Sequence, residues 1–219
     1  MLNRTGVRYV GLSVLAEPFF FNKIIFIFTP DMSLAYKIID QSKLYFITLR
    51  VIGWVDIFTR ESYRKIVTDN LEFCISNKGL EVYAWVLMSN HLHMLVRSNT
   101  NNLSGTLRDF KSFTSKLIIN EIINGTESRK EWMLKLFLKS RPFDRNTRKY
   151  QIWAHCNHAE LIESEKFIEQ KLNYIHNNPV RNGIVVRMED YRYSSAMDYA
   201  GEKGLVSIER IVLRWITYR

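Results

Sequence analysis

The sequence predicts an α+β fold: a ferredoxin-like or RRM-like split βαβ sandwich, with helices packed on one face of an antiparallel sheet and a C-terminal helical tail. Two observations predict this fold. Short runs rich in β-branched and aromatic residues alternate with longer segments of helical periodicity, in the order β-α-β-β-α-β-α. Two of the strand-like runs are separated only by the dipeptide Ser89-Asn90, which predicts a central hairpin.

The first strand and the first helix lie in the stretch that ends at Gly79. KLYFITLRVIG (43–53) is rich in β-branched and aromatic residues and predicts a strand. ESYRKIVTDNLEFCISNK (61–78) carries apolar residues at helical spacing. Thr59 can serve as the N-cap of this helix and Gly79 as its stop, because both residue types are favoured at those positions.

The central hairpin and a second helix follow. EVYAWVLM (81–88) and HLHMLVR (91–97) predict two antiparallel strands, since only a tight connection lies between them. LSGTLRDFKSFTSKLIINEII (103–123) predicts a long helix.

The second half of the chain completes the predicted order. Residues 124–150 are polar and basic and predict a loop, after which YQIWAHC (150–156) alternates as a fourth strand would. A last long helix opens at Ser164 or Glu163 and must end near Pro179, because proline lacks the N–H that a helix interior needs.

Composition bounds the class of protein. The chain has 219 residues, 47% of them hydrophobic, which is enough for one domain with a substantial core. We place that domain at residues 43–201, followed by a C-terminal tail at 202–219. The two cysteines form no paired motif, which suits a reducing compartment. The formal net charge of +9 favours a polyanionic partner, either nucleic acid or an anionic membrane surface.

The N-terminal stretch FFFNKIIFIF (19–28) is apolar, but it contains Lys23 and is followed by Pro30. It is shorter than the roughly 20 residues that a membrane-spanning helix needs. We expect residues 1–42 to be an extension, and Met32 to be the natural start. An added strand or a peripheral membrane anchor is the alternative.

The stretch YAWVLMSNHLHMLVR (83–97) places two histidines inside an apolar run. Alternate residues of a strand share a face, so His91 and His93 project together while Leu92 points into the core. Two imidazoles about 6–7 Å apart along a strand can converge on one metal ion. The alternative is a pair of histidines on the wetter face of a sheet.

A second group of polar residues lies on the last long helix, in QKLNYIHNNPVRNG (170–183). Lys171, Tyr174 and Asn178 share one side of this helix at spacings of three and four residues, so a phenol and an amide oxygen lie one turn apart. His176 points away from them. The alternative is a half-buried tyrosine and an asparagine that ends the helix.

Together the two stretches resemble the single-tyrosine HUH transposases, or IS200-like transposases, and in particular the REP-associated tyrosine transposase branch. The resemblance runs over residues 43–201. Besides the HLH motif, it includes RDFKSFTSK (108–116), YIHNNPVRNG (174–183) and YRYSSAMDY (191–199).

The resemblance implies a site and a reaction. His91, His93 and Asn178 would hold a divalent metal, Mg²⁺ or Mn²⁺. Tyr174 would attack a backbone phosphate of single-stranded DNA, forming a 5′-phosphotyrosine and freeing a 3′-OH. The substrate would be a single-stranded DNA hairpin, met by a monomer or homodimer associated with the nucleoid in a bacterial cytoplasm. The resemblance does not identify a general base.

Several basic residues along the chain could contact the phosphates of the expected DNA substrate. Lysine and arginine bind the phosphate backbone irrespective of base sequence. We expect DNA contacts from Arg108, Lys111, Lys116, Arg148, Lys149 and Arg181.

Two other functions compete with the nuclease. A domesticated protein could hold DNA hairpins without cleaving them, although the intact HLH motif and Tyr174 argue against it. A sheet-based RNA-binding module could use the same fold, but it leaves the histidine pair unexplained.

Overall fold

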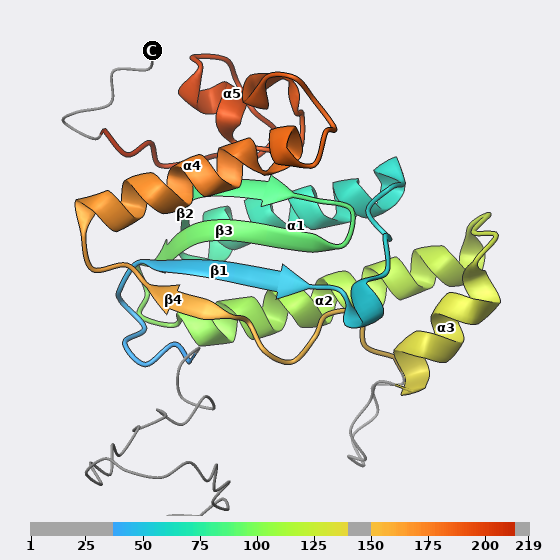
Figure 1. The fold of residues 1–219 in the computed structure, drawn as a ribbon. Helices are drawn as coiled ribbons and strands as arrows, with labels where there is room; N and C mark the ends of the chain where they lie inside the picture. The colour runs from blue at the N-terminus through green and yellow to red at the C-terminus, as the bar shows by residue number, and fades with distance from the viewer. Residues whose placement is uncertain (1–36, 140–149, 213–219) are drawn as a thin grey trace, which may run out of the picture. The chain divides into compact units, whose positions relative to one another are not determined.

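The computed structural model of the protein describes residues 37–139 and 150–212 (Figure 1). All of these residues lie within one compact unit, Asp31–Arg219. The expectations about the first 31 residues, and about Arg148 and Lys149, fall outside the described residues.

The described residues contain one four-stranded sheet in the order β2-β3-β1-β4, with every neighbouring pair antiparallel. Strand β1 is central and pairs with both β3 and β4. This order is that of the split βαβ sandwich, so the predicted fold class is confirmed. The strands are β1 (Tyr45–Arg50), β2 (Leu80–Leu87), β3 (His91–Ser98) and β4 (Ala159–Leu161).

Helices cover both faces of this sheet. Helices α1 (Glu61–Lys78) and α2 (Leu103–Asn124) lie together behind it in Figure 1, as the predicted sandwich requires. The predicted packing of helices on one face holds for α1 and α2 but not for α4 (Glu165–Arg181), which lies across the front of the sheet, against β2 and β3. The sheet therefore separates α1 and α2 from the side chains that face α4.

The ends of α1 follow local chemistry, with one correction. Gly79 adopts the left-handed conformation (φ 65°) and its N–H donates to the Cys74 carbonyl, so it is the predicted helix stop. Thr59 is not the N-cap. Arg60 occupies that position without a side-chain cap, because the Thr59 hydroxyl donates to the Asp56 carbonyl at 3.4 Å instead.

Helix α4 begins as predicted and extends slightly further. The Ser164 hydroxyl caps it by accepting from the Phe167 N–H at 3.2 Å. The helix continues through Pro179 to Arg181, because the Asn182 N–H still donates to the Asn178 carbonyl at 3.1 Å. Asn178 consequently lies inside the helix and not beyond its end.

The prediction for the fourth strand was wrong. Residues 150–156 make only an isolated bridge, Val51 with Trp153, and β4 lies further along the chain. The Trp153 indole is fully buried and donates to the Thr114 hydroxyl at 2.9 Å. The alternation in this segment therefore reflects an aromatic anchor in the core and not a strand.

The expected loop at 124–150 contains a further helix, α3 (Lys130–Lys139). Met133 and Phe137, one turn apart, are fully buried and attach this helix to the core. Three short elements complete the described fold: the turn η1 (Ile52–Trp54) directly after β1, and the turn η2 (Met188–Asp190) and the helix α5 (Ala196–Tyr199) after α4.

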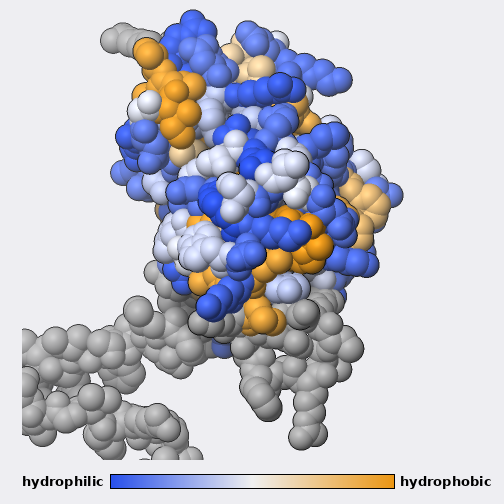
Figure 2. Space-filling model, turned by 90° about the vertical axis from the view of Figure 1, so that its right-hand side faces the viewer, coloured by the Kyte–Doolittle hydropathy of each residue, from blue (hydrophilic) through white to orange (hydrophobic). Residues whose placement is uncertain are grey.

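Among the described residues, no helix is both long and apolar enough to cross a membrane. Figure 2 shows the end of the molecule where η1 and α3 lie, and hydrophilic side chains there surround separate hydrophobic patches.

Candidate active site

The site begins with the alternation of side chains along β1 and β3. His91 and His93 share one face of β3, while Leu92 between them is fully buried on the other. Thr48 of β1 is the cross-strand partner of His93 and faces the same way. The two imidazole rings lie with their centroids 4.6 Å apart, so the strand brings both histidines to one place.

His93 is held by its neighbours in a neutral state. Its Nδ1 lies 2.8 Å from the Thr48 hydroxyl, and its ring stacks on Phe46 at 5.4 Å. The side chain is buried, which lowers the pKa of His93 to about 3. The Nε2 atom remains and faces the Tyr174 hydroxyl at 3.5 Å.

The tautomer of His91 is set by Asn90. The Asn90 Nδ2 donates to Asp56 Oδ1 at 3.0 Å and to the Trp54 carbonyl at 3.3 Å, which turns its Oδ1 toward His91 Nδ1 at 2.7 Å. An amide oxygen only accepts, so the proton lies on Nδ1 and the Nε2 lone pair is left for a ligand. Burial lowers the pKa of His91, which keeps the ring neutral at pH 7.

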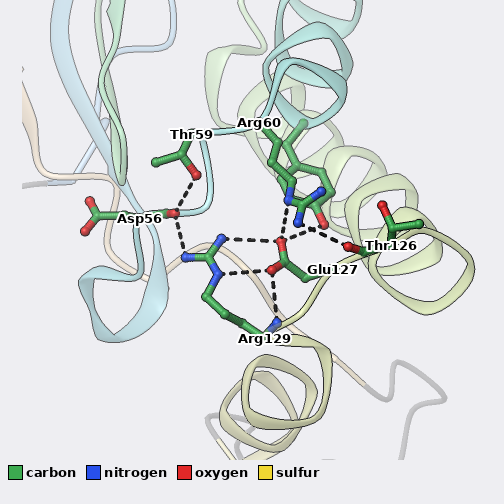
Figure 3. A network of polar contacts seen from close by, with 7 residues as sticks. Asp56, Thr59, Arg60, Thr126, Glu127 and Arg129 are labelled. Atoms are coloured by element: carbon green, nitrogen blue, oxygen red, sulfur yellow. Dashed lines mark hydrogen bonds and ion pairs between the residues drawn. The ribbon is translucent and has the colours of Figure 1, made fainter.

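A network of ion pairs around the buried carboxylate of Glu127 supports the loop that carries Asp56 (Figure 3). The Glu127 carboxylate, whose side chain is 1% exposed, accepts from Arg60 at 2.9 Å and from Arg129 at 3.0 Å. Arg129 also donates to the Asp56 carbonyl at 3.2 Å. The network therefore fixes the loop whose Asp56 side chain orients Asn90.

Helix α4 brings Tyr174 to the histidines. Its buried residues Leu172 and Ile175 fix the helix on the sheet, and Tyr174 is left half-buried between them. The phenol ring meets His93 edge-on at 5.1 Å and Phe46 at 5.8 Å.

Two cations lie one turn before and two turns after Tyr174 on the same helix. Lys171 Nζ lies 2.8 Å from the Glu160 carboxylate and 4.1 Å above the Phe46 ring. The Arg181 guanidinium lies 5.8 Å from the Tyr174 ring centroid and its side chain is exposed. Of the predicted DNA contacts that the structure describes, Arg181 is therefore the one beside the tyrosine.

Asn178 lies one turn beyond Tyr174 and is 6% exposed. Its Oδ1 accepts from Asn182 at 3.0 Å and keeps a second lone pair. Within the described ranges no group of three or more His, Cys, Asp or Glu side chains could hold a metal ion. The two neutral imidazoles lie together, and Asn178, the predicted third ligand, lies one helical turn beyond Tyr174. Imidazole and amide donors of this kind suit a divalent ion that also binds water and phosphate.

The predicted DNA contacts on α2 lie away from this site. Lys111 is a correction: its ammonium donates to Ala154 O, His155 O and Asn157 Oδ1 at 2.6–3.1 Å, which uses all three donors, and burial lowers its pKa to about 8. Arg108 and Lys116 are exposed, but α2 covers the opposite face of the sheet from the histidines.

Several residues of the site escaped the sequence analysis. Thr48 and Phe46 alternate along the first predicted strand, as the histidines do along theirs, but only the cross-strand register shows that the two pairs meet. Asn90 was predicted only as part of the tight hairpin connection, and Asp56 was not singled out. Asn90 directly precedes His91, and this adjacency was the available signal.

Comparison with known proteins supports the resemblance. Residues 44–141 match the family model for IS200-like transposases, a region that includes both histidines and ends before α4. A Haemophilus influenzae protein described as a REP-associated tyrosine transposase is 26% identical over 118 residues, which cover 52% of this chain. The chain spans 58% of the length of that relative.

The fold has a solved counterpart. The structure of a REP-associated tyrosine transposase bound to a REP hairpin superimposes with a TM-score of 0.53 and 17% sequence identity. The match covers 81% of this chain and 98% of the other. The two proteins therefore share a fold.

Proposed function

This chain is related to the IS200-like transposases and resembles their REP-associated branch, and from that premise we propose that it cleaves and rejoins single-stranded DNA. The observation that carries the proposal is the Tyr174 hydroxyl 3.5 Å from Nε2 of His93. A nucleophile beside a pair of neutral imidazoles is the arrangement that metal-assisted phosphoryl transfer to a tyrosine requires.

In this reaction the Tyr174 oxygen forms a bond to phosphorus as the bond from phosphorus to the 3′-oxygen breaks. The tyrosine loses its proton, the leaving 3′-oxygen gains one, and the products are a 5′-phosphotyrosine and a free 3′-OH. Attack by another 3′-OH reverses these steps and rejoins strands. Lys171 and Arg181 flank the tyrosine and favour the negative charge of the approaching phosphate.

His91, His93 and Asn178 are the residues that would hold the divalent ion, Mg²⁺ or Mn²⁺, which when bound would polarise the scissile phosphate. Imidazole is a better ligand for Mn²⁺ than for Mg²⁺, so we expect Mn²⁺ to bind more tightly. Since Nε2 of His93 has one lone pair, it accepts either the Tyr174 hydroxyl or a metal ion at one time.

The substrate we propose is a single-stranded DNA hairpin, in line with the hairpin bound by the structural relative. The test uses hairpin oligonucleotides from the DNA that flanks the gene, labelled at either end, with Mn²⁺ or with EDTA. A 5′-phosphotyrosine leaves the 3′-labelled fragment on the protein and releases the 5′-labelled fragment, so the two labels report the polarity of the reaction.

The variants are Tyr174→Phe and His91→Ala, with Tyr83→Phe as the control because Tyr83 bonds Glu81 on the second strand. We expect a Mn²⁺-dependent adduct with the wild type and Tyr83→Phe, and none with the other two proteins. Hairpin binding without any adduct, equal in all four proteins, would replace the nuclease with a non-cleaving hairpin binder. Preference for RNA hairpins would instead favour an RNA-binding module.

A further inference from the structure

The turn after β1 holds a tryptophan in a backbone conformation that L-residues rarely adopt. Gly53 has φ 66° and Trp54, directly after it, has φ 54°. A bulky residue at positive φ is an outlier that its surroundings must hold in place. Here the Trp54 N–H donates to the Val51 carbonyl at 3.1 Å, and the Trp54 carbonyl accepts from Asn90 at 3.3 Å.

Burial does not account for this tryptophan. Trp54 is 53% exposed, whereas Trp85 and Trp153 are fully buried in the core. The strained backbone at Trp54 therefore exposes the indole to solvent instead of burying it. Residues with strained backbone conformations are common at ligand-binding sites.

The neighbours of the indole belong to the candidate active site. Its ring lies 6.0 Å from the His91 ring, nearly perpendicular to it, and the Arg50 guanidinium lies 5.6 Å from the indole centroid. Arg50 is exposed and is the cross-strand partner of His91. The Asn90 amide that orients His91 also holds the Trp54 carbonyl, so indole and imidazole are tied to one support.

We infer that Trp54 and Arg50 form a binding site for an unpaired nucleobase next to the phosphate that Tyr174 attacks. The indole offers its face to the base, and Arg50 binds the adjacent phosphate. Exposed aromatic rings beside cations bind single strands in this way, without preference for one base, because every base has a π-face. This inference rests on the proposed function for its substrate class, a single DNA strand.

The test measures binding to a fluorescein-labelled single-stranded oligothymidine of about 20 nucleotides, long enough for a stacking site, and to a blunt duplex of equal length. EDTA is present throughout, so binding is measured apart from cleavage. The variants are Trp54→Gly, Trp54→Phe and Arg50→Gln. The matched control is Trp132→Leu, because Trp132 is 55% exposed on α3. Thermal unfolding is followed for each protein.

We expect Trp54→Gly to weaken binding to the single strand about 10-fold and to leave duplex binding unchanged, since stacking needs an unpaired base. Its Tm should stay or rise, because glycine adopts positive φ without strain. Trp54→Phe and Trp132→Leu should bind as the wild type does within about 3-fold, and Arg50→Gln should reduce the salt dependence by about one phosphate contact.

Unchanged binding by Trp54→Gly, an equal loss on duplex, or a fall in its Tm would overturn the inference and leave Trp54 a structural residue. These results are separable from the nuclease. A wild type that forms no adduct defeats the proposed reaction while the binding comparison stands. Conversely, a wild type that forms the adduct while Trp54→Gly binds normally defeats only the nucleobase site.

Discussion

The two faces of the central strands β1 and β3 are built on different principles. On the face toward α1 and α2 four apolar side chains are at most 1% exposed: Ile47, Leu49, Leu92 and Met94. On the face toward α4 lie ring systems and polar atoms with individual partners: Phe46, Thr48, His91 and His93. The same two strands thus supply the core and the candidate site.

The difference shows how one sheet can carry both a packed apolar core and a pair of neutral imidazoles. The apolar face stabilises the fold through its buried area and close packing, so the loss of even a small side-chain volume there lowers stability. On the other face burial lowers the pKa of both imidazoles and keeps them neutral, and particular hydrogen bonds at Nδ1 leave their Nε2 atoms available. Changes on the two faces should therefore separate stability from metal use.

The largest expected effect compares adjacent residues of β3. Leu92→Ala should lower the free energy of unfolding by about 2–5 kcal/mol, because it empties a fully buried volume. His91→Ala should lower it by only about 1 kcal/mol, the contribution of an ordinary hydrogen bond. Urea unfolding of both variants measures this. An equal loss from His91→Ala would mean that the histidine face is part of the core.

A second comparison concerns the support of His91. Asn90→Ala removes the oxygen that fixes its tautomer, so the Mn²⁺ concentration needed for adduct formation should rise about 10–100-fold. Asn77→Ala is the control, because that exposed amide bonds only its own helix, at Phe73. Mn²⁺ titration of both variants decides the matter, and an identical Mn²⁺ requirement would remove Asn90 from the site.

Two buried histidines, His93 and His176, should make the free energy of unfolding depend on pH. His176, whose Nε2 lies 2.9 Å from the Ser195 hydroxyl, has its pKa lowered to about 4 by burial, and His93 to about 3. Both values lie below the unfolded value of 6.5, so the unfolded chain binds more protons in acid. Stability should therefore fall as the pH drops below about 6.5, by up to about 1.4 kcal/mol per pH unit for each histidine.

His176→Gln should make the fall in stability with acid shallower by one proton and leave adduct formation at pH 7 intact, because His176 packs against Ser195 and Tyr199. Equilibrium unfolding between pH 4 and pH 7 measures the slope, with both limits set by the histidine titration range. An unchanged slope would show that His176 titrates alike in both states.

The smallest expected effect concerns DNA contacts on the two sides of the sheet. Arg181→Ala should weaken binding to the single strand a few-fold and lower the salt slope by about 0.7, the loss of one phosphate contact. Lys116→Ala and Arg108→Ala should change binding less than about twofold, because α2 lies behind the sheet. Anisotropy titrations at several salt concentrations test this, and a larger effect from Lys116 would place the DNA path across α2.

The fold was predictable where local signals and pairing agreed. Apolar spacing gave α1 its bounds and Gly79 its end, and the dipeptide after β2 gave the hairpin. The prediction of the fourth strand failed because β4 is short and is defined only by its pairing with β1. Residues 150–156 looked more like a strand because Trp153 and Ile152 anchor them in the core. The helical spacing of Met133 and Phe137 does indicate α3, but the residues around them are polar and basic, so the region was predicted to be a loop.

The site was predictable only in part. Motif spacing indicated His91, His93 and Tyr174, and the structure brings the second and third of these within 3.5 Å. Thr48, Asn90 and Trp54 depend on cross-strand register and backbone conformation, which the spacing of residues does not reveal. Lys111 failed for a similar reason, since its carbonyl partners lie more than 40 positions along the chain.

The central claim is that Tyr174 becomes covalently bound to DNA. The direct measurement is mass spectrometry of the tryptic digest of protein incubated with Mn²⁺ and the flanking hairpin. Trypsin cleaves after Lys171 and Arg181 and releases LNYIHNNPVR, which contains a single tyrosine. We predict that this peptide carries the 5′-phosphonucleotide, and that the modification is absent from Tyr174→Phe. An adduct on another peptide, or one that persists in Tyr174→Phe, would contradict the account.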